Sequence, residues 1–284
     1  MHSNYWSWLD DPEKLFVMSG RDLNDDGTDR GESSSWVYDL KTGKRDVRTI
    51  PKNFAIMAVT PDGKRAVLQQ KIQPTDKIHH QQIYLGTFDG EKPVALFEPS
   101  TILRSSPTFS PDGTRVLMYV EEWANMKPGK TGLFEGDLKS DRLVVLDVTM
   151  RKVTTIFDSK KNESPSGWKW SPNGKRIAYA HRLQTKGLDG PTTVTVSDAD
   201  GKNAKDILEV ESTMGHVGDT GLTLAWSPDG NRIAYLHQSA GPLDQFNHAV
   251  YAARAIVMDA DGKNPTQIFE DKACSWVLMG FDWK

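Results

Sequence analysis

The stretch that decides the fold is Trp226-Ser227-Pro228-Asp229-Gly230-Asn231-Arg232-Ile233-Ala234-Tyr235-Leu236-His237, because three other places in the chain repeat it closely. The shared pattern is Ser or Thr, Pro, Asp or Asn, Gly and, two residues later, Arg; it recurs at residues 60–65, 110–115 and 171–176. Proline fixes φ, the Asp or Asn side chain bonds its own backbone, and Gly accepts a positive φ. Each copy therefore predicts a tight turn between two antiparallel strands.

The residues around each turn predict buried strands. A bulky residue precedes the turn, and a short apolar segment such as residues 233–236 follows it, as in a strand buried on both faces. A second pair of strands with another tight turn, such as residues 261–263, completes each repeat. Repeats of roughly fifty to sixty residues are typical of four-stranded units in a propeller or another closed array.

The repeat runs from end to end. A degraded copy begins at Trp6, and residues 278–283 align with the strand that precedes each turn. We therefore expect an all-β protein, a single β-propeller domain over residues 1–284, with five full four-stranded blades plus the inner strand of a sixth. An orphan inner strand exposes a sheet edge, which indicates either a truncated six-bladed protein or an unusual joining of both ends. The expected blade bounds are 5–50, 54–97, 106–157, 167–208 and 222–269, with a partial blade at 277–284.

Composition narrows the class of partner. The net charge is −3 with acidic and basic residues interspersed, so nucleic acid is not an expected partner. The single Cys274 excludes an intrachain disulfide. No apolar run reaches membrane-spanning length, and residues 1–6 show no charged leader, so neither a membrane span nor a signal peptide is expected. We therefore expect either that the protein is cytoplasmic or that the given sequence starts downstream of the natural N-terminus.

The Ser/Thr-Pro-Asp-Gly-Lys-Arg-Ile-Ala-Tyr motif, with a preceding Trp-x-Trp at Trp168 and Trp170, resembles the repeat of the TolB-like propellers. This family is also called PD40 or WD40-like, and the resemblance covers essentially the whole chain. It implies a TolB-like β-propeller of the six-bladed type and suggests a periplasmic or extracytoplasmic location. It leaves function open, since similar propellers serve as protein-binding modules, as gating domains of serine peptidases and as oligogalacturonate lyases.

Five connections between the second and third strands of the blades are long, namely residues 20–34, 71–82, 121–141, 182–191 and 238–253. Long loops without secondary structure are usually functional or disordered. Because these connections share one face of a propeller, we expect the binding face there. Its candidate residues are His79, His80, Glu121, Glu122, Trp123, His181, Arg182, His216, Asp219, His237, Gln238, Phe246, His248 and Tyr251.

Histidines are frequent on this expected face, and His181 and His237 occupy the same position in their repeats. Imidazoles gathered round a central channel can hold a divalent cation, and the resemblance implies a His-rich metal site like that of the oligogalacturonate lyases. The alternative is that these histidines are ordinary loop residues that lie apart in space.

A second candidate metal site is the segment of residues 22–29, which resembles the calcium loop of EF-hands, dockerins and integrin-type propellers. Alternating oxygen side chains with a Gly at the bend suit Ca²⁺. The match fails later, because Arg30 and Ser33 stand where that loop needs further ligands. A solvated acidic loop is the alternative. The candidate ligands are Asp22, Asn24, Asp26, Thr28 and Asp29.

No catalytic residue is assigned, since the chain has no Gly-x-Ser-x-Gly elbow. The leading prediction is a non-catalytic module that binds a protein or peptide partner on the long-loop face, with a structural Ca²⁺ as an option. Aromatic side chains such as Trp123 would grip the partner or pack against their own loops. The alternative is a metal-assisted polysaccharide lyase or hydrolase of the oligogalacturonate type, with the loop histidines as ligands and Arg182 near the sugar.

Overall fold

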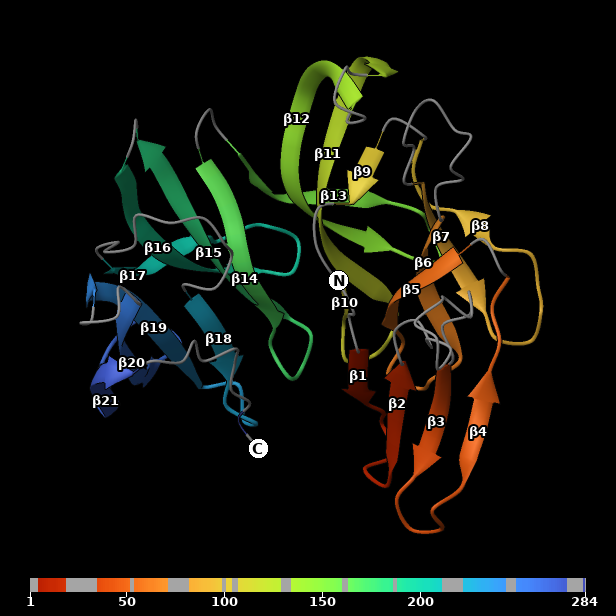
Figure 1. The fold of residues 1–284 in the computed structure, drawn as a ribbon, viewed down its shortest axis with the longest axis horizontal. Helices are drawn as coiled ribbons and strands as arrows, with labels where there is room; N and C mark the ends of the chain where they lie inside the picture. Colours follow the sequence, from red (N-terminus) through yellow and green to blue (C-terminus); the bar gives the residue numbers. More distant parts are fainter. Residues whose placement is uncertain are drawn as a thin grey trace. The chain divides into compact units, whose positions relative to one another are not determined.

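The computed structural model describes residues 5–18, 35–51, 54–70, 82–98, 101–103, 107–128, 134–159, 163–185, 188–210, 222–243, 249–274 and 283. These residues form strands and turns and include no helix, which confirms the all-β expectation. None of this part of the chain therefore supplies a helix that could cross a membrane. The strands assemble into five antiparallel sheets, which we number blades 1 to 5 in chain order (Figure 1).

In four of the blades the strands simply follow one another across the sheet. Blade 1 contains β1 (Tyr5–Trp8), β2 (Lys14–Met18), β3 (Ser35–Asp39) and β4 (Arg45–Arg48). Blade 2 contains β5 (Phe54–Val59), β6 (Arg65–Gln70), β7 (Ile83–Thr87) and β8 (Val94–Ala95). Blade 4 contains β14 (Glu163–Trp170), β15 (Arg176–Thr185), β16 (Leu188–Asp198) and β17 (Lys205–Val210). Blade 5 contains β18 (Leu222–Trp226), β19 (Arg232–Leu243), β20 (Ala249–Asp259) and β21 (Thr266–Cys274).

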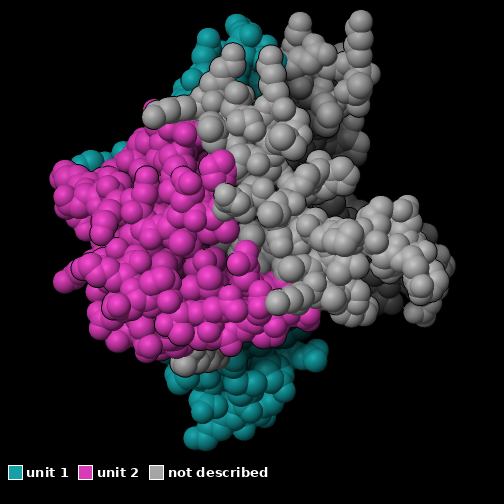
Figure 2. Space-filling view, turned by 90° about the vertical axis from the view of Figure 1, so that its left-hand side faces the viewer, with its two compact units in different colours: residues 1–141, 146–153 teal, residues 142–145, 154–284 magenta. Residues whose placement is uncertain are grey.

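Blade 3 adds a short fifth strand. Its main order is β10 (Thr108–Phe109), β11 (Arg115–Pro128), β12 (Phe134–Asp147) and β13 (Val153–Asp158), and β9 (Thr101–Leu103) pairs with β11. The chain separates into two compact units, Met1–Asp141 with Leu146–Val153 and Arg142–Val145 with Thr154–Lys284, coloured separately in Figure 2. Blades 1 and 2 belong to the first unit and blades 4 and 5 to the second. The single-domain organisation over residues 1–284 stays a prediction.

The repeated motif builds the turn between the first two strands, and blade 5 shows how. Ser227 Oγ donates to Asp229 Oδ1 at 2.5 Å and accepts the backbone N–H of Arg232 at 2.9 Å. The backbone N–H of Asn231 donates to the same carboxylate oxygen at 3.0 Å. Gly230 has φ +69°, a left-handed conformation that glycine adopts without steric cost. The same contacts recur around Thr60 and Asp62, Ser110 and Asp112, and Ser171 and Asn173.

The side chain of the arginine that ends the motif contacts the following blade. In the first unit, Arg65 Nη2 donates to the carbonyl oxygen of Gly113 at 3.1 Å. In the second unit, Arg176 donates in the same way to the carbonyl oxygen of Gly230, and its guanidinium lies 4.9 Å from the Trp226 ring centroid. A guanidinium over an indole ring gains cation–π attraction. The Arg of the motif therefore acts between blades, whereas Ser, Pro, Asp and Gly act within the turn.

The strand after each turn is buried on both faces, as predicted. Three or four successive residues have little or no exposed surface at 66–68, 116–118, 177–180 and 233–236. In the second unit, Ile233, Tyr235 and Leu224 pack with Ala178 and Val194, so the core joins blades 4 and 5. In the first unit, the core cluster around Phe16 and Leu68 joins blades 1 and 2 in the same manner.

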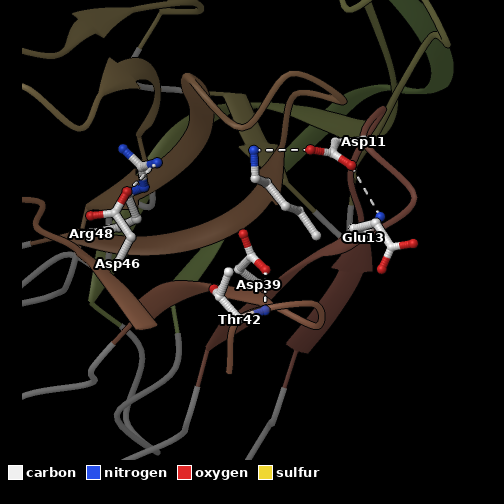
Figure 3. Close-up of polar contacts among 7 residues, drawn as sticks. Asp11, Glu13, Asp39, Thr42, Asp46 and Arg48 are labelled. Atoms are coloured by element: carbon white, nitrogen blue, oxygen red, sulfur yellow. Dashed lines mark hydrogen bonds and ion pairs between the residues drawn. The ribbon is translucent and has the colours of Figure 1, made fainter. Parts of the chain in front are cut away.

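Blade 1 is a complete four-stranded sheet, as the degraded copy predicted, although its turn has no glycine. Asp11 replaces the motif carboxylate: it accepts the backbone N–H of Glu13 at 3.1 Å and pairs with Lys14 Nζ at 2.9 Å (Figure 3). The backbone N–H of Asp10 donates to the carbonyl oxygen of Pro61 at 2.8 Å, which links this turn to the turn of blade 2.

Candidate binding face

The sequence analysis predicted five long loops, but three of these segments form paired β-strands instead. Residues 121–141 belong mainly to β11 and β12, residues 182–191 to β15 and β16, and residues 238–253 to β19 and β20. Their polar composition is typical of loops, but pairing two strands with each other satisfies the backbone donors and acceptors without an apolar core. Residues 20–34, and residues 71–82 apart from Gln82, lie outside the described residues.

The three hairpins extend the second and third strands of their blades well beyond the length needed for the core. Strands β11 and β12 have 14 residues each, and β19 has 12, whereas β6 of blade 2 has 6. Because strands alternate in direction, these hairpins lie at the opposite end of each blade from the Ser/Thr-Pro-Asp-Gly turns. Figure 1 shows the long β11–β12 hairpin in blade 3.

The β11–β12 hairpin brings three candidate residues together. Trp123 Nε1 donates to Glu121 Oε2 at 2.7 Å, and Glu121 is only 7 % exposed. A buried carboxylate is costly unless it is hydrogen-bonded, so the indole N–H compensates part of this cost and fixes the ring. On the same strand, Glu122 accepts Ser140 Oγ at 3.3 Å across the hairpin.

Further along the same hairpin, Asn125 Nδ2 donates to Asp137 Oδ2 at 2.6 Å and again joins the two strands. Asn125 has φ +53°, a conformation that Asn tolerates better than most residues. Leu138, which follows Asp137 in the sequence, is 47 % exposed. We call Glu121, Glu122, Trp123, Asp137 and Leu138 the hairpin patch. Successive residues of a strand point to opposite faces, so Glu121 and Trp123 lie on one face of β11 and Glu122 on the other.

His181 lies in a separate network in the second unit. Its Nε2 is 3.2 Å from Thr195 Oγ1, and Thr195 Oγ1 donates to Asp206 Oδ1 at 2.6 Å. A hydroxyl has one proton to donate, so Thr195 gives its proton to Asp206 and accepts the N–H of His181 Nε2. This arrangement assigns the proton of the neutral imidazole to Nε2 and leaves Nδ1 as the ring acceptor.

Aromatic rings enclose one side of this network. The ring centroid of Phe157 lies 4.8 Å from that of His181 and 5.6 Å from that of Tyr179. Burial, together with the nearby charge of Asp206, raises the pKa of the Tyr179 hydroxyl to about 12. The phenol is therefore neutral throughout the physiological range and serves as a packing group with a polar tip.

Arg182 does not join His181. Successive residues of a strand point to opposite faces of the sheet, and Arg182 Nε donates to Thr192 Oγ1 at 3.4 Å, whereas His181 bonds Thr195. A site that uses both side chains on one ligand therefore needs a ligand that reaches round the sheet. Thr195, Asp206 and Phe157 were missed by the sequence interpretation, because nothing local separates Thr195 from the buried Val-Thr-Val run around it.

The structure describes only some of the remaining predicted site residues. His237 and Gln238 belong to β19 and Tyr251 to β20, and His237 pairs with Arg254 and Leu222 in the backbone register. The described residues contain no group of three or more His, Cys, Asp or Glu side chains that could hold a metal ion. Outside the described residues lie His79, His80, His216, Asp219, Phe246 and His248, and all the calcium-loop candidates, Asp22, Asn24, Asp26, Thr28 and Asp29.

Comparison with known proteins gives no match to any family model and no match among curated proteins. Solved structures do match over most of the chain. A putative TolB from Agrobacterium tumefaciens is 17 % identical with a TM-score of 0.52, over 99 % of this chain and 85 % of that one. An oligogalacturonate lyase in complex with manganese is 14 % identical with a TM-score of 0.60, over 96 % of this chain and 67 % of that one.

A third structure is the β-propeller domain of the Trilobed protease from Pyrococcus furiosus, 15 % identical with a TM-score of 0.52, over 93 % of this chain and 70 % of that one. At such identities the likeness shows the fold alone. The protein is a β-propeller of four-stranded antiparallel blades. Its structural neighbours are TolB-like and related propeller proteins, as the repeat motif predicted.

Proposed function

We propose that this protein is a non-catalytic binding module that takes a protein or peptide partner on the hairpins between the second and third strands of its blades. The observation that carries the proposal is that blades 3, 4 and 5 all extend these strands into hairpins. Strands supply a more rigid platform than loops, and rigid sites bind with a smaller loss of conformational entropy.

The hairpin patch indicates the chemistry of the partner. Trp123 is held by its hydrogen bond to Glu121, so its ring is already oriented before binding. Tryptophan in such a setting is a frequent source of binding energy in interfaces. Glu121 shares the strand face of Trp123, and Asp137 lies on the paired strand of the same hairpin, so two acidic side chains accompany the indole. A peptide with an apolar anchor flanked by Lys or Arg would complement this patch.

Peptide binding tests the proposal. Random decapeptides displayed on phage are selected on the wild-type protein, and an enriched peptide is labelled and titrated by fluorescence anisotropy. We expect Trp123→Ala to weaken binding by about tenfold or more, as truncation of an interface hot spot does. The matched control is Met150→Ala, which removes an exposed apolar side chain from the β12–β13 turn at the opposite end of blade 3. Equal binding by the two variants contradicts the assignment.

We also propose that residues 277–284 form the inner strand of a sixth blade. Of these residues the structure describes Trp283, whose ring centroid lies 5.1 Å from the guanidinium of Arg232. The same contact joins Arg176 of blade 4 to Trp226 of β18, the inner strand of blade 5. Trp283 thus has the partner that an inner-strand Trp of a following blade would have.

A metal-assisted lyase or hydrolase of acidic polysaccharides is the second candidate function. Two observations favour it: His181 uses Nε2 in its hydrogen bond with Thr195, which leaves Nδ1 as the ring acceptor, and one structural neighbour is an oligogalacturonate lyase in complex with manganese. Untagged protein dialysed against Mn²⁺ would then retain one equivalent of metal and cleave oligogalacturonate, and His181→Ala would lose both. Retention of neither metal nor cleavage by the wild type rejects this function.

A further inference from the structure

The turn of blade 4 differs from the other full copies of the repeated motif, because asparagine precedes its glycine. The copies at 60–65, 110–115 and 227–232 have Asp at this position, whereas blade 4 has Asn173 followed by Gly174. This is the only Asn-Gly pair in the sequence. The side-chain amide of Asn can be attacked by the backbone nitrogen of the next residue, and glycine hinders this attack least because it has no Cβ. Blade 4 therefore contains the pair of residues in this chain best suited to deamidation.

In the folded protein, hydrogen bonds engage both of the groups that would react. The backbone N–H of Gly174 donates to the carbonyl oxygen of Ser171 at 2.8 Å. Asn173 Oδ1 accepts Ser171 Oγ at 2.9 Å and the backbone N–H of Lys175 at 3.0 Å. The attacking nitrogen must lose its proton, and the side-chain amide must rotate toward it. Both changes break hydrogen bonds of the closed turn, although Asn173 itself is exposed to water.

Opening of this turn also disturbs its contact with blade 5. Arg176, which ends the motif in blade 4, donates to the carbonyl oxygen of Gly230, and its guanidinium lies 4.9 Å from the Trp226 ring centroid. A Cβ on Gly230 would lie 3.6 Å from Pro172 Cδ, so the two turns touch. Local opening requires free energy in proportion to the contacts that it breaks. The contact between blades 4 and 5 therefore adds to the protection of Asn173.

We propose that Asn173 is a modification site that deamidates when the turn of blade 4 opens, and that the fold accepts only one of the two products. The Gly174 nitrogen forms a bond to Asn173 Cγ while the Cγ–Nδ2 bond breaks. Nδ2 leaves as ammonia and carries away the proton of the Gly174 N–H. Water then opens the cyclic imide, either at Cγ to give aspartate or at the main-chain carbonyl carbon to give isoaspartate. The net reaction hydrolyses one amide and adds one negative charge.

The motif of blade 5 shows why aspartate is accepted. Asp229 holds the same turn with hydrogen bonds from Ser227 Oγ at 2.5 Å and from the backbone N–H of Asn231 at 3.0 Å. A charged carboxylate accepts such bonds more strongly than a neutral amide does. In isoaspartate the main chain instead passes through Cβ and Cγ, which lengthens the turn by one atom. The N–H of Gly174 then loses its alignment with the carbonyl of Ser171, so this product leaves the turn open.

Mass spectrometry of aged protein tests the proposal, because deamidation changes the mass of the peptide that contains Asn173. The reference is a free synthetic peptide of residues 169–178. We expect Asn173 in the folded protein to react more slowly than in this peptide by about tenfold or more, because reaction waits for local opening. In urea the two rates should be equal. Chromatography against synthetic standards separates the aspartate and isoaspartate products.

Two serine variants examine the role of the turn. Ser171→Ala removes the hydroxyl that holds Asn173 Oδ1 and should raise the rate in the folded protein by about two- to tenfold, the equivalent of one hydrogen bond. The matched control is Ser110→Ala, which removes the same hydroxyl from the turn of blade 3 and should leave the rate at Asn173 unchanged. Equal rates at Asn173 in the two variants would show that the turn hydrogen bonds do not protect it.

The product is tested with Asn173→Asp, which should fold and be at least as stable as the wild type to urea at neutral pH. Limited proteolysis of aged protein should leave aspartate in the resistant fraction and remove the chains that contain isoaspartate. Deamidation of the folded protein at the rate of the free peptide overturns the proposal. A destabilised Asn173→Asp, or isoaspartate in the resistant fraction at the ratio found in the free peptide, contradicts the selection of one product.

Discussion

The guanidinium of Arg232 lies 5.1 Å from the ring centroid of Trp283, almost the same separation as the 4.9 Å between Arg176 and Trp226. The second pair joins blade 4 to the inner strand of blade 5, and Trp226 Nε1 also donates to the carbonyl oxygen of Lys169 at 3.3 Å. This repetition supports the proposal that residues 277–284 form the inner strand of a sixth blade.

A double-mutant cycle on Arg232 and Trp283 tests whether this contact stabilises the fold. A cation–π pair contributes about 0.5–2 kcal/mol, so Arg232→Ala and Trp283→Ala should show a coupling energy in that range by urea denaturation. The Arg176 and Trp226 pair is the positive control. A coupling energy near zero for Arg232 and Trp283 would mean that the contact with Arg232 does not stabilise the position of Trp283.

Two glycines with similar backbone conformations should respond differently to alanine. Gly262 has φ +87° and its Cβ would meet the carbonyl oxygen of Ile207, whereas Gly90 has φ +90° and no atom within 4 Å of its Cβ position. Both substitutions carry the left-handed cost of about 1–2 kcal/mol, but Gly262→Ala adds a backbone clash worth about 1–3 kcal/mol. Chemical denaturation measures the difference, and equal losses would show that the blade 4–blade 5 contact is loose.

Acid should weaken the turns that contain aspartate. The hydrogen bond from Ser227 Oγ, followed by that from the Asn231 backbone N–H, lowers the pKa of Asp229 below its usual 3.8. A carboxyl whose pKa is lower in the folded state stabilises the protein above the unfolded value and loses that contribution as pH falls through the folded value. Asp229→Asn should therefore make unfolding less sensitive to pH below 3.8.

Blade 4 provides the natural precedent for this substitution, since Asn173 holds the same hydrogen bonds from Ser171 and the Lys175 backbone without titrating. Urea melts of the wild type and Asp229→Asn at several acidic pH values make the comparison. An unchanged pH dependence in the variant would show that Asp229 does not contribute to acid unfolding.

Thr195→Val should break the His181 network without changing side-chain shape. Thr195 is buried at 3 % exposure and bridges His181 Nε2 to Asp206. Loss of the bridge is expected to cost about 1–3 kcal/mol, because His181 loses its hydrogen-bond acceptor. Nitrogen-detected NMR should report the Nε2–H tautomer in the wild type and a mixture in the variant. Thr192→Val, which removes the hydroxyl that Arg182 contacts on the opposite face, should leave the His181 signals unchanged.

Calcium binding at residues 22–29 predicts a rise in melting temperature on addition of Ca²⁺, because a ligand that binds the folded state alone stabilises it. Asp22→Ala should abolish the rise, and Asp46→Ala, which removes an exposed acid paired with Arg48, should preserve it. A melting temperature that does not respond to Ca²⁺ leaves an acidic loop as the interpretation of this segment.

Much of the fold follows from the sequence because its information is local. The turn at Ser227, Asp229 and Gly230 is built by hydrogen bonds within six residues, and its copies at 60, 110 and 171 mark the other blades. Alternating turns and strand-sized apolar runs then define four-stranded sheets, which the structure confirms even for blade 1 with its degraded motif. The hairpins were misjudged as loops because strand pairing away from a core leaves little apolar periodicity to detect.

The sequence by itself determined the turns, the repeat and the class of fold, since each depends on residues close together in the chain. Tertiary structure alone decided that His181 meets Thr195 and Asp206 rather than Arg182, that Glu121 is buried and accepts the indole N–H of Trp123, and that Ile268 is exposed where Ile207 lies under a turn. The reason is that these contacts are set by strand register and by the packing of one blade on the next, neither of which is encoded in any single segment.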